Sequence, residues 1–144
     1  MTVAAILRHK GFHVAAVGPT VAVSEIARML TDRRIGAVLV QDAADHMLGI
    51  VSERDIIHCL SANGARALEM TAGQLMTRAL KTVTPQTTVR EAMTIMTAAR
   101  IRHLPVLDDG ELVGIISIGD VVKARIMQQE QEVDELKAYV AGSA

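Results

Sequence analysis

The sequence is poor in aromatic residues, with one Phe, one Tyr and no Trp. Proteins that bind single-stranded nucleic acid stack bases on aromatic side chains, and proteins that bind duplexes gather Lys and Arg into a basic patch. Here the formal net charge is −1, and the basic residues are spread along the chain without a basic tail or stripe. We therefore expect no nucleic-acid partner.

Cysteine and long apolar runs are also scarce. The single cysteine, Cys59, rules out an internal disulfide framework and is typical of a reducing cytoplasm. No apolar run approaches the roughly 20 residues that span a bilayer. The N-terminus, Met1 to Arg8, lacks the pattern of a signal peptide. Because the apolar content is 50%, which is ample for a core, we expect a soluble, cytoplasmic, globular protein with no membrane partner.

What the sequence does contain is an internal repeat. Its clearest landmark is an apolar strand that stops at a Ser, with an Asp three residues later; it occurs at Gly49 to Asp55 and again at Gly114 to Asp120. Upstream, Val17-Gly18-Pro19 matches Val83-Thr84-Pro85 at a constant offset, which shortens by one residue after the following turn. A repeat this regular indicates two copies of one unit.

Each copy predicts the same order of elements. An extended stretch, roughly 13–17 in the first copy, ends at Gly-Pro. A helix follows with apolar residues at i, i+3, i+4 and i+7, and in the second copy Thr88 and Glu91 form a capping box, whereas the first copy has Ala22 at the cap. Two strands around a turn, with Asp109-Gly110 in the second copy, predict a hairpin. A last helix, about 54–62 in the first copy, completes a β-α-β-β-α unit of the α+β class.

These elements divide the chain into a first unit at 5–64, a connector at 65–74, a second unit at 75–127, and a C-terminal helix extension and tail at 128–144. About sixty residues are marginal for an independent core, so the copies should pack on each other. From Val121 to about Val140 there is no Gly or Pro, and apolar residues recur at near-heptad spacing, interrupted by Gln129. This predicts a long helix that packs on a neighbouring subunit or on the protein's own core, and the sequence leaves both open.

Three linked features carry a resemblance to a known family: Val-x-Pro opening each unit, Arg102-His103-Leu104-Pro105-Val106 in the second copy, and Ser-x-x-Asp in both. Over roughly 5–127 the sequence resembles a tandem CBS-domain module, also called a Bateman module, of the small free-standing bacterial type. The resemblance implies a flat, pseudo-twofold module with two clefts. One or both would hold an adenosine-containing ligand, such as AMP, ADP, ATP, NAD(H) or S-adenosylmethionine.

Asp55 and Asp120 are the first candidates for a binding site. A carboxylate suits a ribose, because its two oxygens accept hydrogen bonds from both the 2′ and the 3′ hydroxyl. Ser52 or Ser117, with the free N–H groups at the start of the next helix, can bind phosphate. The other interpretation is that Ser-x-x-Asp before an apolar helix is simply an N-terminal cap. The resemblance favours ribose binding for Asp120, and the Ser is able to serve both purposes.

Arg102 and His103 lie on an otherwise apolar strand, where a charge must find a partner or reach solvent. The resemblance implies that this position supplies basic groups to nucleotide phosphates, for which Arg is well suited. The alternative is a surface Arg and a half-buried His that make ordinary contacts. The first copy has Gly36 and Ala37 here, with Arg54 as the candidate substitute, so the two clefts should differ.

The resemblance also implies that the base is recognised by backbone groups and small side chains at the beginning of each unit. The candidates are Lys10, Val14 and Ala15 for one cleft, and Thr77, Lys81 and Thr82 for the other. The alternative for each is an ordinary linker or strand-edge residue.

We therefore expect a regulatory module that binds an adenine nucleotide, with AMP as the first choice and ATP, ADP or NAD as alternatives. It would form a homodimer and report its occupancy to an effector protein that the sequence does not identify. The alternative is a structural dimerisation module with vestigial clefts and no physiological ligand.

An enzyme is the second rival, but the sequence shows no nucleophile with an adjacent base and no Walker loop. His9 and His13 stand four apart, a spacing that can hold a metal on a helix. Gly11 between them argues against a stable helix, and no carboxylate or thiol joins them. We expect no catalytic residue, no metal and no required cofactor.

Overall fold

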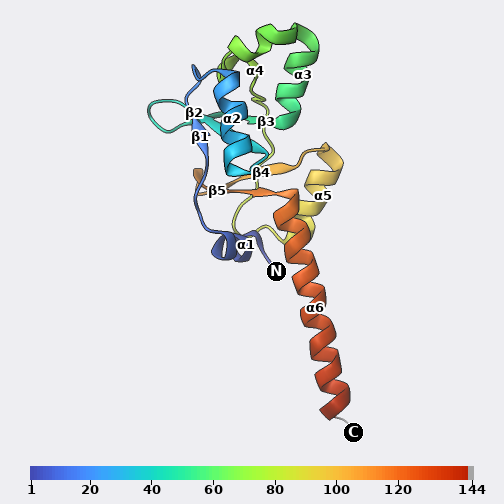
Figure 1. Ribbon diagram of the computed structural model, residues 1–144. Coiled ribbons are helices and arrows are strands. Elements are labelled where there is room, and N and C mark those ends of the chain that lie inside the picture. Colours follow the sequence, from blue (N-terminus) through green and yellow to red (C-terminus); the bar gives the residue numbers. More distant parts are fainter. Residues whose placement is uncertain (143–144) are drawn as a thin grey trace. The chain divides into compact units, whose positions relative to one another are not determined.

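The computed structural model of the protein describes residues 1–142 and confirms the predicted mixture of helices and small sheets (Figure 1). The elements, in chain order, are α1 (Val3–Lys10), β1 (Ala16–Val17), α2 (Val23–Arg33), β2 (Ala37–Gln41), β3 (Met47–Ser52), α3 (Glu53–Asn63), the 3₁₀ helix η1 (Gly64–Glu69), α4 (Ala72–Leu75), α5 (Val89–Ala99), β4 (His103–Asp108), β5 (Glu111–Ser117) and α6 (Ile118–Gly142). Residues 143–144 of the predicted tail lie outside the described residues.

The chain divides into two compact units that do not coincide with the two copies of the repeat. Unit 1 comprises residues 1–12 and residues from 81 onward, and unit 2 comprises residues 13–80. The predicted boundaries at 5 and 75 follow the repeat rather than these compact units, and they stay predictions. The segment before each copy packs with the other copy, so α1 belongs with the second copy, and α4 with the first.

Backbone hydrogen bonds at the Val-x-Pro corners explain this exchange. At the start of α1, the Ala4 N–H donates to the carbonyl of Pro85 (2.9 Å), and at the start of α4 the Gly73 N–H donates to the carbonyl of Pro19 (2.8 Å). The first N–H groups of a helix have no acceptor within the helix. Each corner supplies such an acceptor. The predicted connector at 65–74 overlaps two short helices, η1 and α4.

Both units contain the predicted hairpin. In unit 2, β2 and β3 are antiparallel and β1 pairs with β2 in parallel. In unit 1, β4 and β5 are antiparallel, and the strand that would correspond to β1 is reduced to one parallel bridge between Val83 and Val106. Asp109 and Gly110 both have positive φ, 50° and 80°, which is the type I′ conformation that Asp-Gly favours in two-residue hairpins.

The helix ends also follow the sequence. Thr88 and Glu91 form the predicted capping box at the start of α5, whereas Ala22 caps α2 without a side-chain hydrogen bond. α3 ends at Gly64, whose φ is positive, as Asn-Gly predicts. Local chemistry therefore sets the start of α5 and the end of α3, whereas the start of α2 has no side-chain cap.

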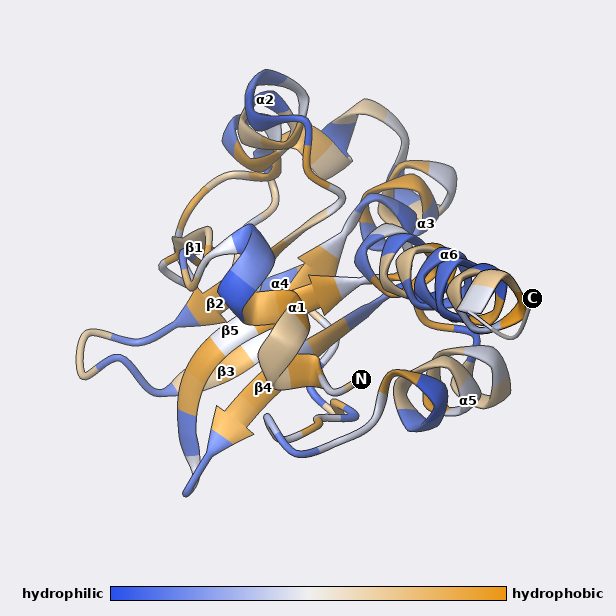
Figure 2. Cartoon of the chain, turned by 90° about the horizontal axis from the view of Figure 1, so that it is seen from below, coloured by the Kyte–Doolittle hydropathy of each residue, from blue (hydrophilic) through white to orange (hydrophobic). Residues whose placement is uncertain are grey.

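Each unit has its own hydrophobic core. In both units the core is built from the inward faces of the amphipathic helix and of the strands that it covers, and Cys59 is buried on α3 as expected. Figure 2 shows hydrophobic residues, in orange, on β4. The central buried side chains are Val3, Leu7, Leu104 and Ile116 in unit 1, and Val23, Ile26, Val38 and Val51 in unit 2.

α6 is the long C-terminal helix that the sequence predicts, and it runs for 25 residues. Its buried side chains are Val121 and Ala124, and every residue from 129 to 142 is exposed. The second half of α6 therefore does not pack on the protein's own core, and it extends beyond the rest of unit 1 (Figure 1). None of the helices within residues 1–142 is both long and apolar enough to cross a membrane.

Candidate functional site

The candidate residues of unit 1 meet where β5 ends and α6 begins. His103, the first residue of β4, is paired in register with Ser117, the last residue of β5. The N–H of Ile118 donates to the carbonyl of Arg102 (2.8 Å). Since neighbouring strands lie about 5 Å apart, the hairpin brings the basic pair next to the Ser117–Asp120 landmark. The sequence alone could not place them together.

Ser117 and Asp120 cap the start of α6. The backbone N–H of Ser117 donates to Asp120 Oδ2 (2.8 Å), and the N–H of Asp120 donates to Ser117 Oγ (3.2 Å). This reciprocal pair is the geometry of a capping box, so the cap interpretation is correct as far as it goes. It uses one carboxylate oxygen, and within the described residues no protein group donates to the other oxygen, Oδ1.

Lys10 brings a positive charge to the same carboxylate. From the last turn of α1, its Nζ donates to Asp120 Oδ2 (2.7 Å) and to the carbonyl of Ile115 (3.0 Å). The two side chains are 31% and 23% exposed, so the ion pair is only partly screened by solvent. The cap and the ion pair together hold the Asp120 carboxylate in one orientation.

These contacts decide the charge of Asp120. Partial burial disfavours the ionised carboxylate, but the hydrogen bonds from Lys10 and Ser117 and the charge of Lys10 outweigh it and hold the pKa of Asp120 below its ordinary value. Asp120 is therefore a fixed anion with an open oxygen at the start of a helix. Such a group is able to accept hydrogen bonds from a pair of hydroxyls.

Lys81 and Thr82 lie at the same end of the unit 1 sheet. They are exposed and directly precede Val83, whose bridge to Val106 is parallel. Because the two segments run parallel, the residues before Val83 lie beside the residues before Val106. Lys81 and Thr82 therefore lie at the end of the sheet where β4 starts and β5 ends. Unit 1 thus gathers the candidates Lys10, Lys81, Thr82, Arg102, His103, Ser117 and Asp120.

Unit 2 repeats the capped helix start with different partners. Asp55 Oδ2 accepts from the N–H (2.8 Å) and the Oγ–H (3.0 Å) of Ser52, as part of the capping box of α3. Its second oxygen, Oδ1, accepts from the hydroxyl of Thr77 (3.0 Å). Both oxygens of Asp55 therefore already have protein donors, in contrast to those of Asp120.

The neighbouring strand of unit 2 carries no basic pair. Ala37 is paired in register with Ser52, and the Glu53 N–H donates to the carbonyl of Gly36 (3.0 Å). These two small residues occupy the place of Arg102 and His103, as the alignment of the copies predicts. The remaining candidates of unit 2 are Arg54 on α3 and Val14 and Ala15 at the entry to β1.

The candidates predicted for one cleft are divided between the two units. Lys10, predicted with Val14 and Ala15, lies in unit 1, and Thr77, predicted with Lys81 and Thr82, lies in unit 2. Which cleft each of them serves stays a prediction. The cause of this division is the exchange of α1 and α4 between the copies. Both side chains bind a carboxylate, and the sequence contains no local pattern that reveals these contacts.

Gly49 and Gly114 are positions of close approach that the sequence landmark contains but does not explain. A Cβ atom on Gly49 would lie 2.6 Å from the carbonyl oxygen of Thr77, and one on Gly114 would lie 2.7 Å from Cδ2 of Leu7. Each glycine therefore lets the segment that precedes the other copy approach the hairpin. This close approach brings Thr77 to Asp55 and helps to bring α1, with Lys10, to Asp120.

Comparison with known proteins agrees with this geometry. The family model for the CBS domain matches the chain twice, at residues 3–62 and 72–126. The chain belongs to the CBS domain family. The resemblance seen in the sequence is thereby confirmed, as is the tandem arrangement. The two CBS matches begin at α1 and α4, the helices that each pack with the other copy.

Relatives of this CBS-domain protein are known from both sequence and structure. The mitochondrial CBS domain-containing protein CBSX3 of Arabidopsis thaliana is 36% identical over 124 residues, which cover 83% of this chain and 60% of the relative. The chain thus spans less than two thirds of that relative's length. The crystal structure of the CBS-domain containing protein ATU1752 from Agrobacterium tumefaciens has 44% sequence identity and a TM-score of 0.84, covering 86% of this chain and 92% of that one.

A further solved structure contains a ligand. The crystal structure of CBSX2 in complex with AMP has 27% identity and a TM-score of 0.72, and the match covers 89% of this chain and 98% of that one.

Proposed function

We propose that this CBS pair is a regulatory module that binds an adenine nucleotide, with AMP as the first choice, at the unit 1 site. The observation that carries the proposal is the Asp120 carboxylate, which is held ionised and oriented while its Oδ1 has no protein donor among the described residues. The AMP complex of CBSX2 supports the choice of ligand class.

Each part of the nucleotide has a counterpart in unit 1. Asp120 Oδ1 accepts from the ribose hydroxyls, and the Ser117 hydroxyl and the basic pair of Arg102 and His103 face the phosphate. The dipole of the 25-residue helix α6 favours a phosphate near its start, although the N–H groups of Ile118 and Asp120 there already donate to the Arg102 carbonyl and to Ser117 Oγ. The backbone near Thr82 at the sheet entry meets the base.

Unit 2 is the weaker site in this proposal. Asp55 has protein donors on both oxygens, and Gly36 and Ala37 bring no charge to the phosphate position. Arg54 is the candidate basic residue for a ligand there. A nucleotide in unit 2 has to displace Thr77 from Asp55, which the ligand in unit 1 does not need to do.

A thermal-shift screen of the purified chain with AMP, ADP, ATP, NAD and S-adenosylmethionine tests the proposal. A ligand that binds only the folded state raises the free energy of unfolding, by about 2.7 kcal/mol at a hundredfold excess over Kd, and therefore raises Tm. If all five leave Tm unchanged at millimolar concentration, the module is a structural dimerisation unit with vestigial clefts. Turnover of a bound nucleotide would instead show an enzyme.

The phosphate assignment has its own test. Replacing Arg102 and His103 together with Ala should weaken the binding of AMP by more than about tenfold, because hydrogen bonds to charged groups contribute about 1.5–3 kcal/mol. Calorimetry should show little change for adenosine, which has no phosphate. Equal losses for AMP and adenosine would show that the pair does not meet the phosphate.

In this proposal the module reports its nucleotide occupancy to an effector protein. The module itself acts as a homodimer in the cytoplasm. A ligand shifts a conformational equilibrium only by its different affinity for the two states. At the unit 1 site the ligand contacts the start of α6 directly, so this helix is the element through which occupancy is reported. Pull-down from cell extract with and without AMP would identify an effector whose binding depends on the ligand.

A further inference from the structure

α6 carries an apolar seam with the spacing of a coiled coil. The seam comprises Val122, Ile126, Gln129, Val133, Leu136 and Val140, which follow one another at alternating steps of four and three residues. This is the a/d pattern of a heptad, with Ile126 and Val133 at a and Leu136 at d. The five apolar members are between 44% and 62% exposed.

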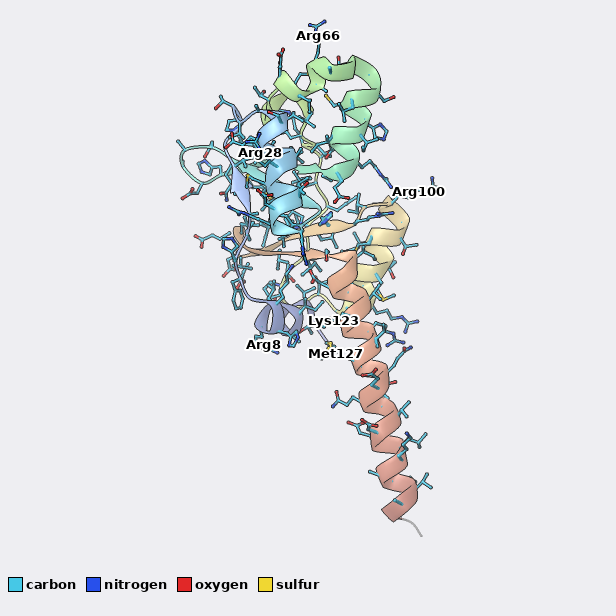
Figure 3. All side chains as sticks on the ribbon, viewed as in Figure 1. Arg8, Arg28, Arg66, Arg100, Lys123 and Met127 are labelled. Carbon is cyan, nitrogen blue, oxygen red and sulfur yellow. The ribbon has the colours of Figure 1, made fainter. Side chains whose placement is uncertain are left out.

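The second half of this helix is exposed to solvent along its whole length. Residues 129–142 are all exposed, and Figure 3 shows their side chains standing out from α6 with no other ribbon beside them. Isolated helices of about 12–15 residues are marginal in water. At the N-terminal end of α6 the seam borders a groove of about 390 Å³, which is lined by residues that include Ile118, Val122 and Ile126.

Gln129 restricts which helix can cover the seam. In a parallel, in-register pair every seam residue faces its own counterpart, so the two Gln129 amides share one layer and can hydrogen-bond to each other. In an antiparallel pair a positions face d positions, and Gln129 would face a Val or Ile. A buried amide without a partner is costly. A single Asn or Lys at an a position is known to set register in coiled coils, and we expect Gln129, at d, to act in the same way.

The flanking charges complement each other in the same arrangement. In a parallel pair, a g position lies beside the e position of the next heptad on the other helix. Here Arg125 at g lies beside Glu130 at e, and Glu132 at g lies beside Lys137 at e. Both combinations have opposite charge, and twofold symmetry makes each of them occur twice.

We propose that α6 pairs with α6 of a second copy of this chain as a parallel, in-register, two-stranded coiled coil. The pair places the starts of both α6 helices, each with its Asp120, at the same end of the coil. The proposal does not depend on nucleotide binding.

Sedimentation equilibrium of the full chain tests the pairing. Leu136→Lys should weaken dimerisation by at least about a hundredfold, because two buried Leu side chains are lost per dimer. The matched control Gln131→Lys makes the same change of charge at an exposed position off the seam and should change Kd by less than about fivefold. A wild-type monomer at all concentrations, or a dimer that Leu136→Lys leaves intact, overturns the proposal.

Disulfide trapping tests the orientation. Val133→Cys should oxidise to a covalent dimer under native conditions, because residue 133 faces itself only in the parallel, in-register pair, whereas Gln131→Cys should not. The native Cys59 is buried, so we expect it to form no disulfide in this assay. If Val133→Cys forms no more covalent dimer than Gln131→Cys, the parallel arrangement is wrong.

A charge exchange provides a second test of the orientation. Glu132→Lys should weaken the dimer, and the double variant with Lys137→Glu should restore it, since these two positions meet only in the parallel pair. Failure of the double variant to recover would also contradict the parallel arrangement.

Discussion

Asp120→Ala separates the two roles that the structure assigns to this carboxylate. The change removes the acceptor of the Ser117 N–H and the partner of Lys10. It also removes the open oxygen that the proposed ribose contact uses. The variant should therefore lose both stability and nucleotide affinity.

The loss of stability follows from the two contacts. Removing a capping side chain costs about 1 kcal/mol. The Lys10–Asp120 pair is partly screened, with side chains 31% and 23% exposed, and adds up to about 1 kcal/mol. A total of about 1–2 kcal/mol lowers Tm by about 3–8 °C for a chain of this size.

The internal repeat provides the matched control. Asp55→Ala removes the same cap from α3 and the contact with Thr77, so it should cost about 1 kcal/mol as well. Urea unfolding compares the stability of the two variants, and calorimetry with AMP compares their affinities. We expect Asp120→Ala to weaken AMP binding by more than about tenfold, and Asp55→Ala to leave it nearly unchanged.

Two outcomes would refute this reasoning. If both variants lose stability but bind AMP like the wild type, the carboxylates are caps and nothing more. If Asp55→Ala loses AMP binding and Asp120→Ala retains it, the nucleotide binds in unit 2 and the assignment of the stronger site is wrong.

Two further predictions concern stability. Gly49→Ala should destabilise by about 2–3 kcal/mol in urea unfolding, because the backbone carbonyl of Thr77 has to move, whereas Gly114→Ala meets only the end of a flexible leucine side chain and should cost about 1 kcal/mol or less; equal costs would contradict this difference. Because the pKa of Asp120 is lowered in the folded state, the contribution of Lys10 should be fully present above about pH 4 and should disappear as the pH falls through the lowered pKa. Urea unfolding of Lys10→Met against wild type should show that loss, and a difference that does not change with pH would show that the ion pair is not its source.

Local rules predicted much of this protein because its element limits are set by short-range chemistry. The Thr88–Glu91 capping box, the Asp109-Gly110 turn and the stop at Gly64 each depend on residues within a few positions of one another. The repeat carried the order of elements from one copy to the other, although not every local signal, since Ala22 stands where the second copy has its capping box. The family resemblance followed from other motifs, namely Val-x-Pro and Ser-x-x-Asp in both copies and the Arg102–Val106 segment.

Sequence patterns identified several candidate site residues but did not show which of them lie close together. The Ser-x-x-Asp landmarks and the basic pair at Arg102 are visible as patterns, but their distance from one another depends on the register of β4 and β5. Sequence patterns report which face of an element is apolar, whereas register and partner choice depend on packing over the whole unit.

What the sequence by itself determined is therefore the repeat, its element order and the apolar seam of α6. The tertiary structure decided which helix joins which copy, so that Lys10 reaches Asp120, 110 positions away, and only one of the two carboxylates keeps an oxygen without a protein donor among residues 1–142. The physical reason is that contacts between distant segments depend on close approach at points such as Gly49 and Gly114, where the space available is set by the folded core rather than by neighbouring residues.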